Sequence, residues 1–141
     1  MKTETVTRGV LILAIMTMSA LLFAASKPED DALKSAEQWL SLVDAGKFGE
    51  SWKTAADYFR TAVPQEQWER SLDAVRKPLG TLVSRNLKTA RYTRSVPGAP
   101  DGEYVILQFD TSFTNKKEAI ETVTPMLEKD GQWRVSGYYI R

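Results

Sequence analysis

The sequence has 141 residues, with 19 basic and 18 acidic side chains and neither cysteine nor histidine. When Lys2, Glu4 and Arg8 of the N-terminal segment are set aside, 17 charges of each sign remain. This balance argues against a nucleic-acid-binding protein, which needs a basic face, and gives no support for binding to anionic lipid. Without cysteine there are no disulfides and no thiol chemistry. Without histidine there is no Ser-His-Asp triad and no His-ligated zinc or copper site, and we expect neither a metal nor a cofactor.

The first 26 residues have the three-part layout of a secretory signal peptide. Lys2 and Arg8 make a basic start, and an unbroken run of apolar or small side chains follows over residues 9–25. Ala24 and Ser26 fit the small-x-small rule for a cut after Ser26. The alternative is an uncleaved membrane anchor, although the run is shorter than the roughly 20 residues of a spanning helix.

Residues 27–141 are of suitable length for a single domain with one core. If residues 1–26 are removed as a signal peptide, we expect the domain in the periplasm or outside the cell. If residues 9–25 are retained, the domain is held at the inner membrane.

Three consecutive acids, Glu29, Asp30 and Asp31, form the densest carboxylate cluster of the chain. One interpretation is an oxygen-only metal site. We favour the start of a helix, where carboxylates stabilise the positive end of the helix dipole and accept from free N–H groups.

Helical spacing dominates the first half of the exported part. Apolar residues recur at three- and four-residue intervals over residues 33–43, and Gly46 ends this predicted helix. A second helix is predicted over residues 48–60. A third begins at Pro64 and ends near Lys77, because a proline follows.

The period changes to two after Gly80, which predicts strands. Four strands are expected, over residues 81–93, 104–113, 117–128 and 132–140. The reversals between them fall at residues 96–102, at residues 114–116 and at Asp130-Gly131. Helices followed by strands predict an α+β fold, with N-terminal helices packed on one face of a four-stranded antiparallel sheet.

Five local patterns carry a resemblance to known proteins: residues 39–48, 50–52, 76–80, 100–104 and 133–139. They are similar to an exported bacterial family catalogued as domain of unknown function 4019. The order of elements also resembles the cone-shaped nuclear-transport-factor-two-like superfamily, also called cystatin-like. The family resemblance implies no activity, so no site residue is carried over. The superfamily resemblance implies a curved sheet and a pocket that holds an apolar ligand, hosts an isomerase or dehydratase, or is filled by side chains.

The pairing of the last two strands follows if Asp130-Gly131 makes a two-residue turn. The predicted pairs are Glu128 with Trp133, Leu127 with Arg134, Met126 with Val135, and Val123 with Tyr138. Both faces then carry large apolar groups, so one set is left exposed: either Val123, Tyr138 and Ile140, or Met126, Val135 and Tyr139. An exposed apolar sheet face favours a partner surface. We predict a homodimer through the outer sheet face, with another envelope protein as the alternative partner.

Aromatic side chains are the candidates for lining a ligand pocket. The helical ones are Trp39, Trp52, Phe59 and Trp68, and the strands add Tyr104, Phe109 and Tyr138, with Asp110 as a polar candidate. We favour core packing for them, because aromatic groups bury large areas and a small domain without disulfides depends on its core.

Two carboxylates are candidates for acid-base chemistry. Asp110 follows Phe109 in an apolar strand, and Glu121 shares a strand face with Val123. Burial would raise the pKa of either carboxyl toward the range useful for proton transfer. A tyrosine, Tyr58, Tyr104 or Tyr138, would then supply an O–H donor. The alternative places Asp110 on the solvent side and pairs Glu121 with Arg85 or Arg91.

Arg76 and Arg85 flank the junction between the last helix and the first strand. They either hold an anionic ligand or, as we favour, donate to helix carbonyls or pair with acids across the junction.

The most consistent function is a non-enzymatic binding or interaction domain of the cell envelope. A binder of small apolar ligands is the first alternative. An isomerase- or dehydratase-like enzyme, with a buried carboxylate beside a tyrosine, is the second and is disfavoured by the absence of histidine. An interior filled by side chains favours the interaction domain, whereas an open pocket with a carboxylate and a tyrosine favours the enzyme.

Overall fold

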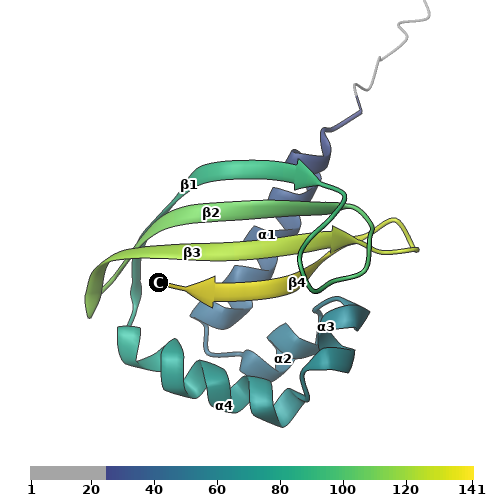
Figure 1. Ribbon diagram of the computed structural model, residues 1–141. Helices are drawn as coiled ribbons and strands as arrows, with labels where there is room; N and C mark the ends of the chain where they lie inside the picture. Colours follow the sequence, from purple (N-terminus) through teal and green to yellow (C-terminus); the bar gives the residue numbers. More distant parts are fainter. Residues whose placement is uncertain (1–24) are drawn as a thin grey trace, which may run out of the picture.

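The computed structural model describes residues 25–141, and its helices precede its strands (Figure 1). The helices are α1 (Pro28–Asp44), α2 (Phe48–Lys53), α3 (Asp57–Ala62), α4 (Gln65–Val75) and the short 3-10 helix η1 (Lys77–Leu79). The strands are β1 (Leu82–Thr93), β2 (Tyr104–Phe113), β3 (Lys116–Leu127) and β4 (Trp133–Ile140). The predicted hydrophobic run and most of the predicted signal peptide lie outside the described residues.

The four strands form an antiparallel sheet in the order β1-β2-β3-β4. The sheet is curved and unclosed; α1 lies against its inner face, and α2, α3 and α4 lie on the β4 side (Figure 1). The predicted α+β fold with N-terminal helices on a four-stranded sheet is therefore confirmed.

Helix α1 begins and ends where the sequence predicts. Glu29, Asp30 and Asp31 occupy its first turn, as expected of carboxylates at the positive end of a helix. Gly46 follows the helix with a φ of 74°, the left-handed conformation that favours glycine after a helix. No helix of the described residues is long and apolar enough to cross a membrane.

The second predicted helix is wrong as a single element, because the chain breaks it into α2 and α3. Between them, Ala55 and Ala56 are buried, and the Ala56 N–H donates to the Val135 carbonyl of β4 at 2.8 Å. This hydrogen bond joins the helical layer to the edge of the sheet. The third helix starts one residue later than predicted, with Pro64 as the residue before its first turn.

The register of the last hairpin differs from the two-residue-turn prediction near the turn. Leu127 pairs with Trp133 and Met126 with Arg134, whereas the predicted pair of Val123 with Tyr138 is confirmed. A bulge between Thr124 and Pro125 reconciles the two registers. Proline has no N–H to donate to a neighbouring strand, so a bulge is the place in an inner strand that tolerates it. The Ser136 hydroxyl donates to the Thr124 carbonyl there, at 2.7 Å.

The bulge also changes which side chains face the interior. It brings Val135 onto the same face as Tyr138, so neither predicted exposed set occurs. Val123 and Val135 are buried, and of the large apolar side chains in β3 and β4 only Tyr139 is exposed. The apolar surface on the outer face is therefore smaller than expected. The homodimer stays a prediction.

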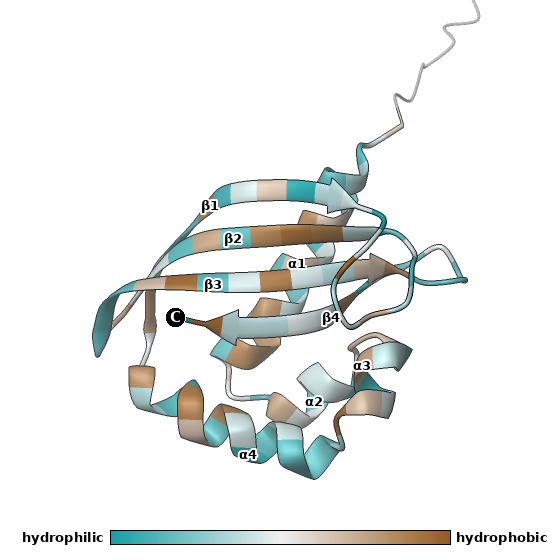
Figure 2. Cartoon of the chain, in the orientation of Figure 1, coloured by the Kyte–Doolittle hydropathy of each residue, from teal (hydrophilic) through white to brown (hydrophobic). Residues whose placement is uncertain are grey.

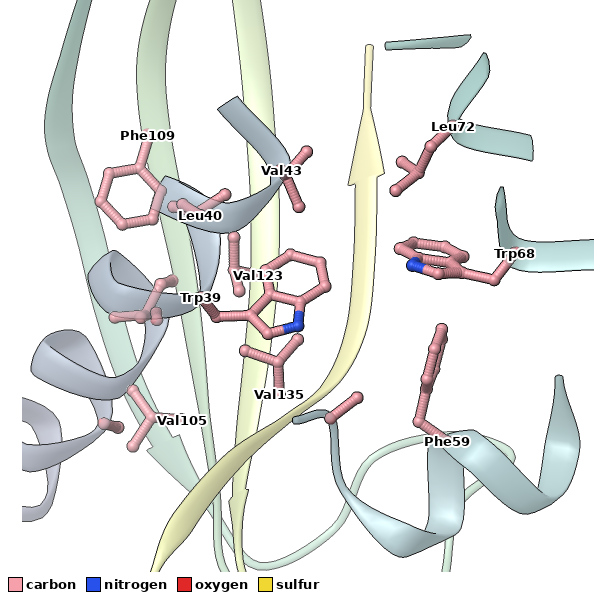
Figure 3. Close-up of a cluster of buried hydrophobic side chains, with 14 residues drawn as sticks. Trp39, Leu40, Val43, Phe59, Trp68, Leu72, Val105, Phe109, Val123 and Val135 are labelled. Carbon is pink, nitrogen blue, oxygen red and sulfur yellow. The ribbon is translucent and has the colours of Figure 1, made fainter. Parts of the chain in front are cut away.

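The core lies between α1, the inner face of the sheet and the remaining helices. Figure 3 shows Trp39 of α1 extending between Val123 and Val135 toward the side where Trp68 and Phe59 project from α4 and α3. Along α4, hydrophobic and hydrophilic bands alternate (Figure 2), as expected of a helix with one buried face. The centre of the core is thus occupied by aromatic rings.

Candidate functional site

A cluster of charged side chains lies inside the fold, at one end of the aromatic core. Asp44 is the last residue of α1, Arg76 follows α4, Arg85 lies in β1, Glu121 in β3 and Tyr138 in β4. The cluster therefore connects the helices to three of the four strands, of which β1 and β3 are not neighbours in the sheet. We call these five residues the interior network.

Glu121 is the most deeply buried member, with 0% of its surface exposed. Its Oε1 atom accepts from Arg85 Nε at 2.7 Å and from the Thr111 hydroxyl at 2.6 Å. Its Oε2 atom accepts from Arg85 Nη2 at 3.2 Å and from the Tyr138 hydroxyl. Each carboxylate oxygen thus accepts two hydrogen bonds from side chains of the same chain.

Asp44 holds the opposite side of the Arg85 guanidinium. Arg85 Nη1 donates to Oδ2 at 2.8 Å, and Arg85 Nη2 donates to Oδ1 at 2.9 Å. Arg76 donates to the same Oδ1 at 3.2 Å and to the Gly80 carbonyl at 2.7 Å, and its guanidinium lies 4.3 Å from the centre of the Phe113 ring. The favoured prediction for the two arginines, partners among carbonyls and acids across the junction, is confirmed.

The interior network holds two cations and two anions, so its formal charge is balanced. Burial alone would lower the pKa of Arg85, but its hydrogen bonds to Asp44 and Glu121 raise it above its ordinary value. Burial, and then the nearby Glu121 carboxylate, raise the pKa of Tyr138 far above its ordinary value. Arg85 is therefore always charged and Tyr138 always neutral under physiological conditions.

Four of the predicted pocket residues come together beside the network. The Trp39 ring lies 5.2 Å from Tyr138 and 6.2 Å from Trp68, and the Phe59 ring lies 4.9 Å from Trp68, in contacts measured between ring centres. Both indole N–H groups have internal acceptors on Ser51: Trp39 donates to its carbonyl at 2.8 Å and Trp68 to its hydroxyl at 3.0 Å. These aromatic rings contact one another, and Trp39 also lines a surface hollow of about 370 Å³ beside Leu42 and Val135.

Of the other predicted pocket residues, Phe109 lies in the hydrophobic core, and three lie elsewhere. Trp52 is half-buried and donates to the Val63 carbonyl at 2.7 Å, which fixes the link between α3 and α4. Tyr104 is buried but is not part of the hydrophobic core cluster. Its hydroxyl donates to the Pro100 carbonyl in the loop before β2. Asp110 lies on the outer face of β2 with its side chain 62% exposed.

Sequence reasoning foresaw part of the interior network and missed the rest. The pairing of Glu121 with Arg85 is one of the two alternatives that the sequence left open. Asp44 and Thr111 were not foreseen. Asp44 carried a usable signal, because an acid in the last turn of a helix meets the negative end of the dipole and needs a cation nearby.

Two surface hollows lie away from this network. One of about 900 Å³ lies among α3, the loop before β2 and the β3–β4 turn, and one of about 580 Å³ lies on the outer face of the sheet around Asp110. Neither is lined by Glu121 or Tyr138. Among residues 25–141, no three acidic side chains are grouped so that they could hold a metal ion.

Comparisons with known proteins agree with the fold and assign no activity. A family model described as "Protein of unknown function (DUF4019)" matches residues 35–138. Among solved structures, a 2.5 Å structure of a protein from Catenulispora acidiphila is similar to this chain, with a TM-score of 0.51 and 13% sequence identity over 79% of this chain and 88% of that one. At this identity the likeness shows the fold alone. No curated protein matches.

Proposed function

We propose that this chain, which belongs to the family described as "Protein of unknown function (DUF4019)", is an exported, non-enzymatic interaction domain. The family assigns no activity, so the proposal rests on the interior of the fold. An enzyme or ligand-binding protein of this architecture would use the space between α1 and the sheet. In this chain that space holds the aromatic core and the interior network.

One observation carries the proposal. Glu121 is the only buried carboxylate among the described residues with a tyrosine partner, and neither of its oxygens is free to accept another hydrogen bond. A general base must reach the proton that it removes, at about 2.6–3.2 Å. Glu121 is fully buried, and four hydrogen bonds from Arg85, Thr111 and Tyr138 occupy its two oxygens. The pair required for acid-base chemistry is therefore used to hold the fold together.

An apolar ligand is tested directly with a dye that fluoresces when it enters an apolar cavity, such as 1-N-phenylnaphthylamine. We expect no saturable binding by the wild-type protein. Trp68→Ala removes a ring from the core and supplies the positive control, since the cavity left by a deleted core side chain can accept an apolar guest. Leu72→Ala, a smaller deletion in the same helix, serves if the tryptophan variant does not fold. Stoichiometric binding by the wild type would contradict the proposal.

Export is supported by the position of the predicted cut relative to the fold. Helix α1 begins at Pro28, and residues 25–27 before it are exposed and belong to no helix or strand. A cut after Ser26 would therefore leave every described element intact. N-terminal sequencing of the protein from cells should begin at Lys27. A chain that begins at Met1 and stays with the membrane fraction would instead identify residues 9–25 as an anchor.

A further inference from the structure

The two edge strands of the sheet, β4 and β1, differ in how far other elements cover them. At the β4 edge, α3 lies alongside, Ala56 donates to the Val135 carbonyl, and only Tyr139 of the eight residues is exposed. At the other edge, β1 pairs with β2 alone among the described elements, and eight of its twelve residues are exposed. Figure 1 shows β1 on the side of the sheet away from α2, α3 and α4. One long edge thus carries backbone groups that no described element covers.

The free edge of β1 also exposes apolar side chains. Val83 is 64% exposed and Leu87 is 44% exposed, and together they are two of the four large apolar residues that the described part of the chain exposes. They lie on either side of Arg85, whose own side chain is engaged in the interior network. An extended chain laid along β1 would cover both of them.

The charge of this edge has a single sign. The sequence of β1 contains Arg85, Lys88 and Arg91 and no acidic residue. Lys88 approaches only Asp110, at 4.0 Å, and none of the ion pairs found over residues 25–141 includes Arg91. An incoming strand therefore meets two exposed cations: Arg91, which is in none of those ion pairs, and Lys88, whose acidic neighbour Asp110 is 4.0 Å away.

We propose that the free edge of β1 is a docking site for an extended segment of a partner protein in which acidic residues alternate with apolar ones. The segment adds to the sheet as a fifth strand through backbone hydrogen bonds, its apolar side chains cover Val83 and Leu87, and its acids pair with Lys88 and Arg91. This inference rests on the proposed function, of which it names the partner.

The same features disfavour a second copy of this chain at the edge. Pairing β1 with another β1 would bring together two strands that each expose Lys88 and Arg91 and contain no acid, and like charges across a strand pair are destabilising. Charged residues and bulges on edge strands also prevent indiscriminate pairing. β1 has such register shifts at Val83 and at Lys88, and its exposed Lys88 and Arg91 favour an acidic partner strand over a basic one.

The test uses the protein as cells produce it and two blocked, labelled ten-residue peptides, one alternating Val with Glu and one alternating Val with Lys. Fluorescence anisotropy should show that the acidic peptide binds at least roughly tenfold more tightly than the basic one, with weaker binding at high salt. Hydrogen-deuterium exchange should slow over residues 82–93 when the acidic peptide is added.

Charge reversal identifies the surface. Lys88→Glu combined with Arg91→Glu should reverse the preference between the two peptides. Lys34→Glu combined with Lys129→Glu, which changes two exposed lysines of α1 and the β3–β4 turn, is the matched control and should keep it.

Equal binding of the two peptides, binding of neither, or protection mapped outside residues 82–93 would overturn the inference. Protection of residues 82–93 that grows with protein concentration in the absence of peptide would also overturn it, because a second copy would then cover the edge. These outcomes leave the proposed function untouched as long as the interior takes up no dye. Dye uptake would overturn the proposed function whatever the peptides do.

Discussion

The guanidinium of Arg85 in β1 reaches across β2 and meets the carboxylate of Glu121 in β3, with 2.7 Å between Nε and Oε1. The same guanidinium binds Asp44 at the end of α1. A single side chain therefore joins two non-adjacent strands to the helix that covers them. This relationship explains why an acid is present at a helix end and why a carboxylate is fully buried.

Removing the charge of Glu121 should destabilise the protein strongly. Glu121→Gln keeps the shape of the side chain but leaves Arg76 and Arg85 with Asp44 as their single anionic partner. Breaking a buried ion pair from one side costs about 3–5 kcal/mol. Urea denaturation measures the free energy of unfolding. Asp110→Asn, on the exposed outer face, is the control and should change it by less than about 0.5 kcal/mol; equal effects of the two variants would show that the network does not stabilise the fold.

Tyr138 makes stability depend on pH in alkali. Its pKa is raised from the ordinary value of 10.0, so above pH 10 the unfolded chain loses a proton that the folded protein keeps. The stabilisation from Tyr138 is complete below pH 10 and is lost as the pH rises above it. The difference in unfolding free energy between wild type and Tyr138→Phe should therefore shrink above pH 10. Absorbance at 295 nm, which follows tyrosine ionisation, tests the same point: an ionisation near pH 10 in the folded wild type that is missing from folded Tyr138→Phe would refute it.

Gly80 lies at the junction between η1 and β1, where both the backbone conformation and the space favour glycine. Its φ is 80°, and a Cβ atom there would lie 2.1 Å from the Thr114 hydroxyl oxygen. Gly98 has the same φ of 80° but open space around it, which makes it a matched control. Gly98→Ala should cost about 1–2 kcal/mol from the left-handed backbone. Gly80→Ala should cost clearly more in denaturant unfolding, and equal costs would show that the contact with Thr114 relaxes freely.

A homodimer is predicted through the outer sheet face. The apolar surface available to it there consists of the exposed Tyr139 and the half-buried Ile106, Ile120 and Met126. Light scattering after size exclusion should give the mass of two chains. Tyr139→Asp, which places a charge at the centre of this contact, should give the mass of one. If the wild-type protein has the mass of one chain at high micromolar concentration, the homodimer prediction is wrong.

Much of the fold could be predicted because its signals are local. The alternation in residues 104–113 identifies β2, and the spacing in residues 33–43 identifies α1, since each pattern matches the geometry of its own element. The break between α2 and α3 was not predictable in this way. It depends on Ala56 bonding to Val135, almost 80 residues away in the chain, and local spacing does not report such a partner.

The interior network shows the same limit. Arg85 and Arg91 are six residues apart, so strict alternation places both on one face of β1 and either could pair with Glu121. The register shift between Leu87 and Thr89 separates them: Arg85 pairs across from Thr111 on the inner face, and Arg91 lies opposite Ile106 on the outer face. Bulges depend on backbone contacts between strands, which local spacing does not report. One bulge decides which arginine pairs with Glu121, and another decides which face of the sheet Val135 occupies.

The central claim is that Glu121 is closed off from solvent and substrate, and chemical labelling of carboxylates tests it most directly. Native protein is treated with a carbodiimide and an amine, and the modified residues are located by mass spectrometry. Asp110, with its side chain 62% exposed, is the internal standard in the same chain. We predict that Asp110 is labelled readily and that Glu121 reacts only after the protein is unfolded. Labelling of Glu121 in the folded protein at a rate close to that of Asp110 would contradict the account.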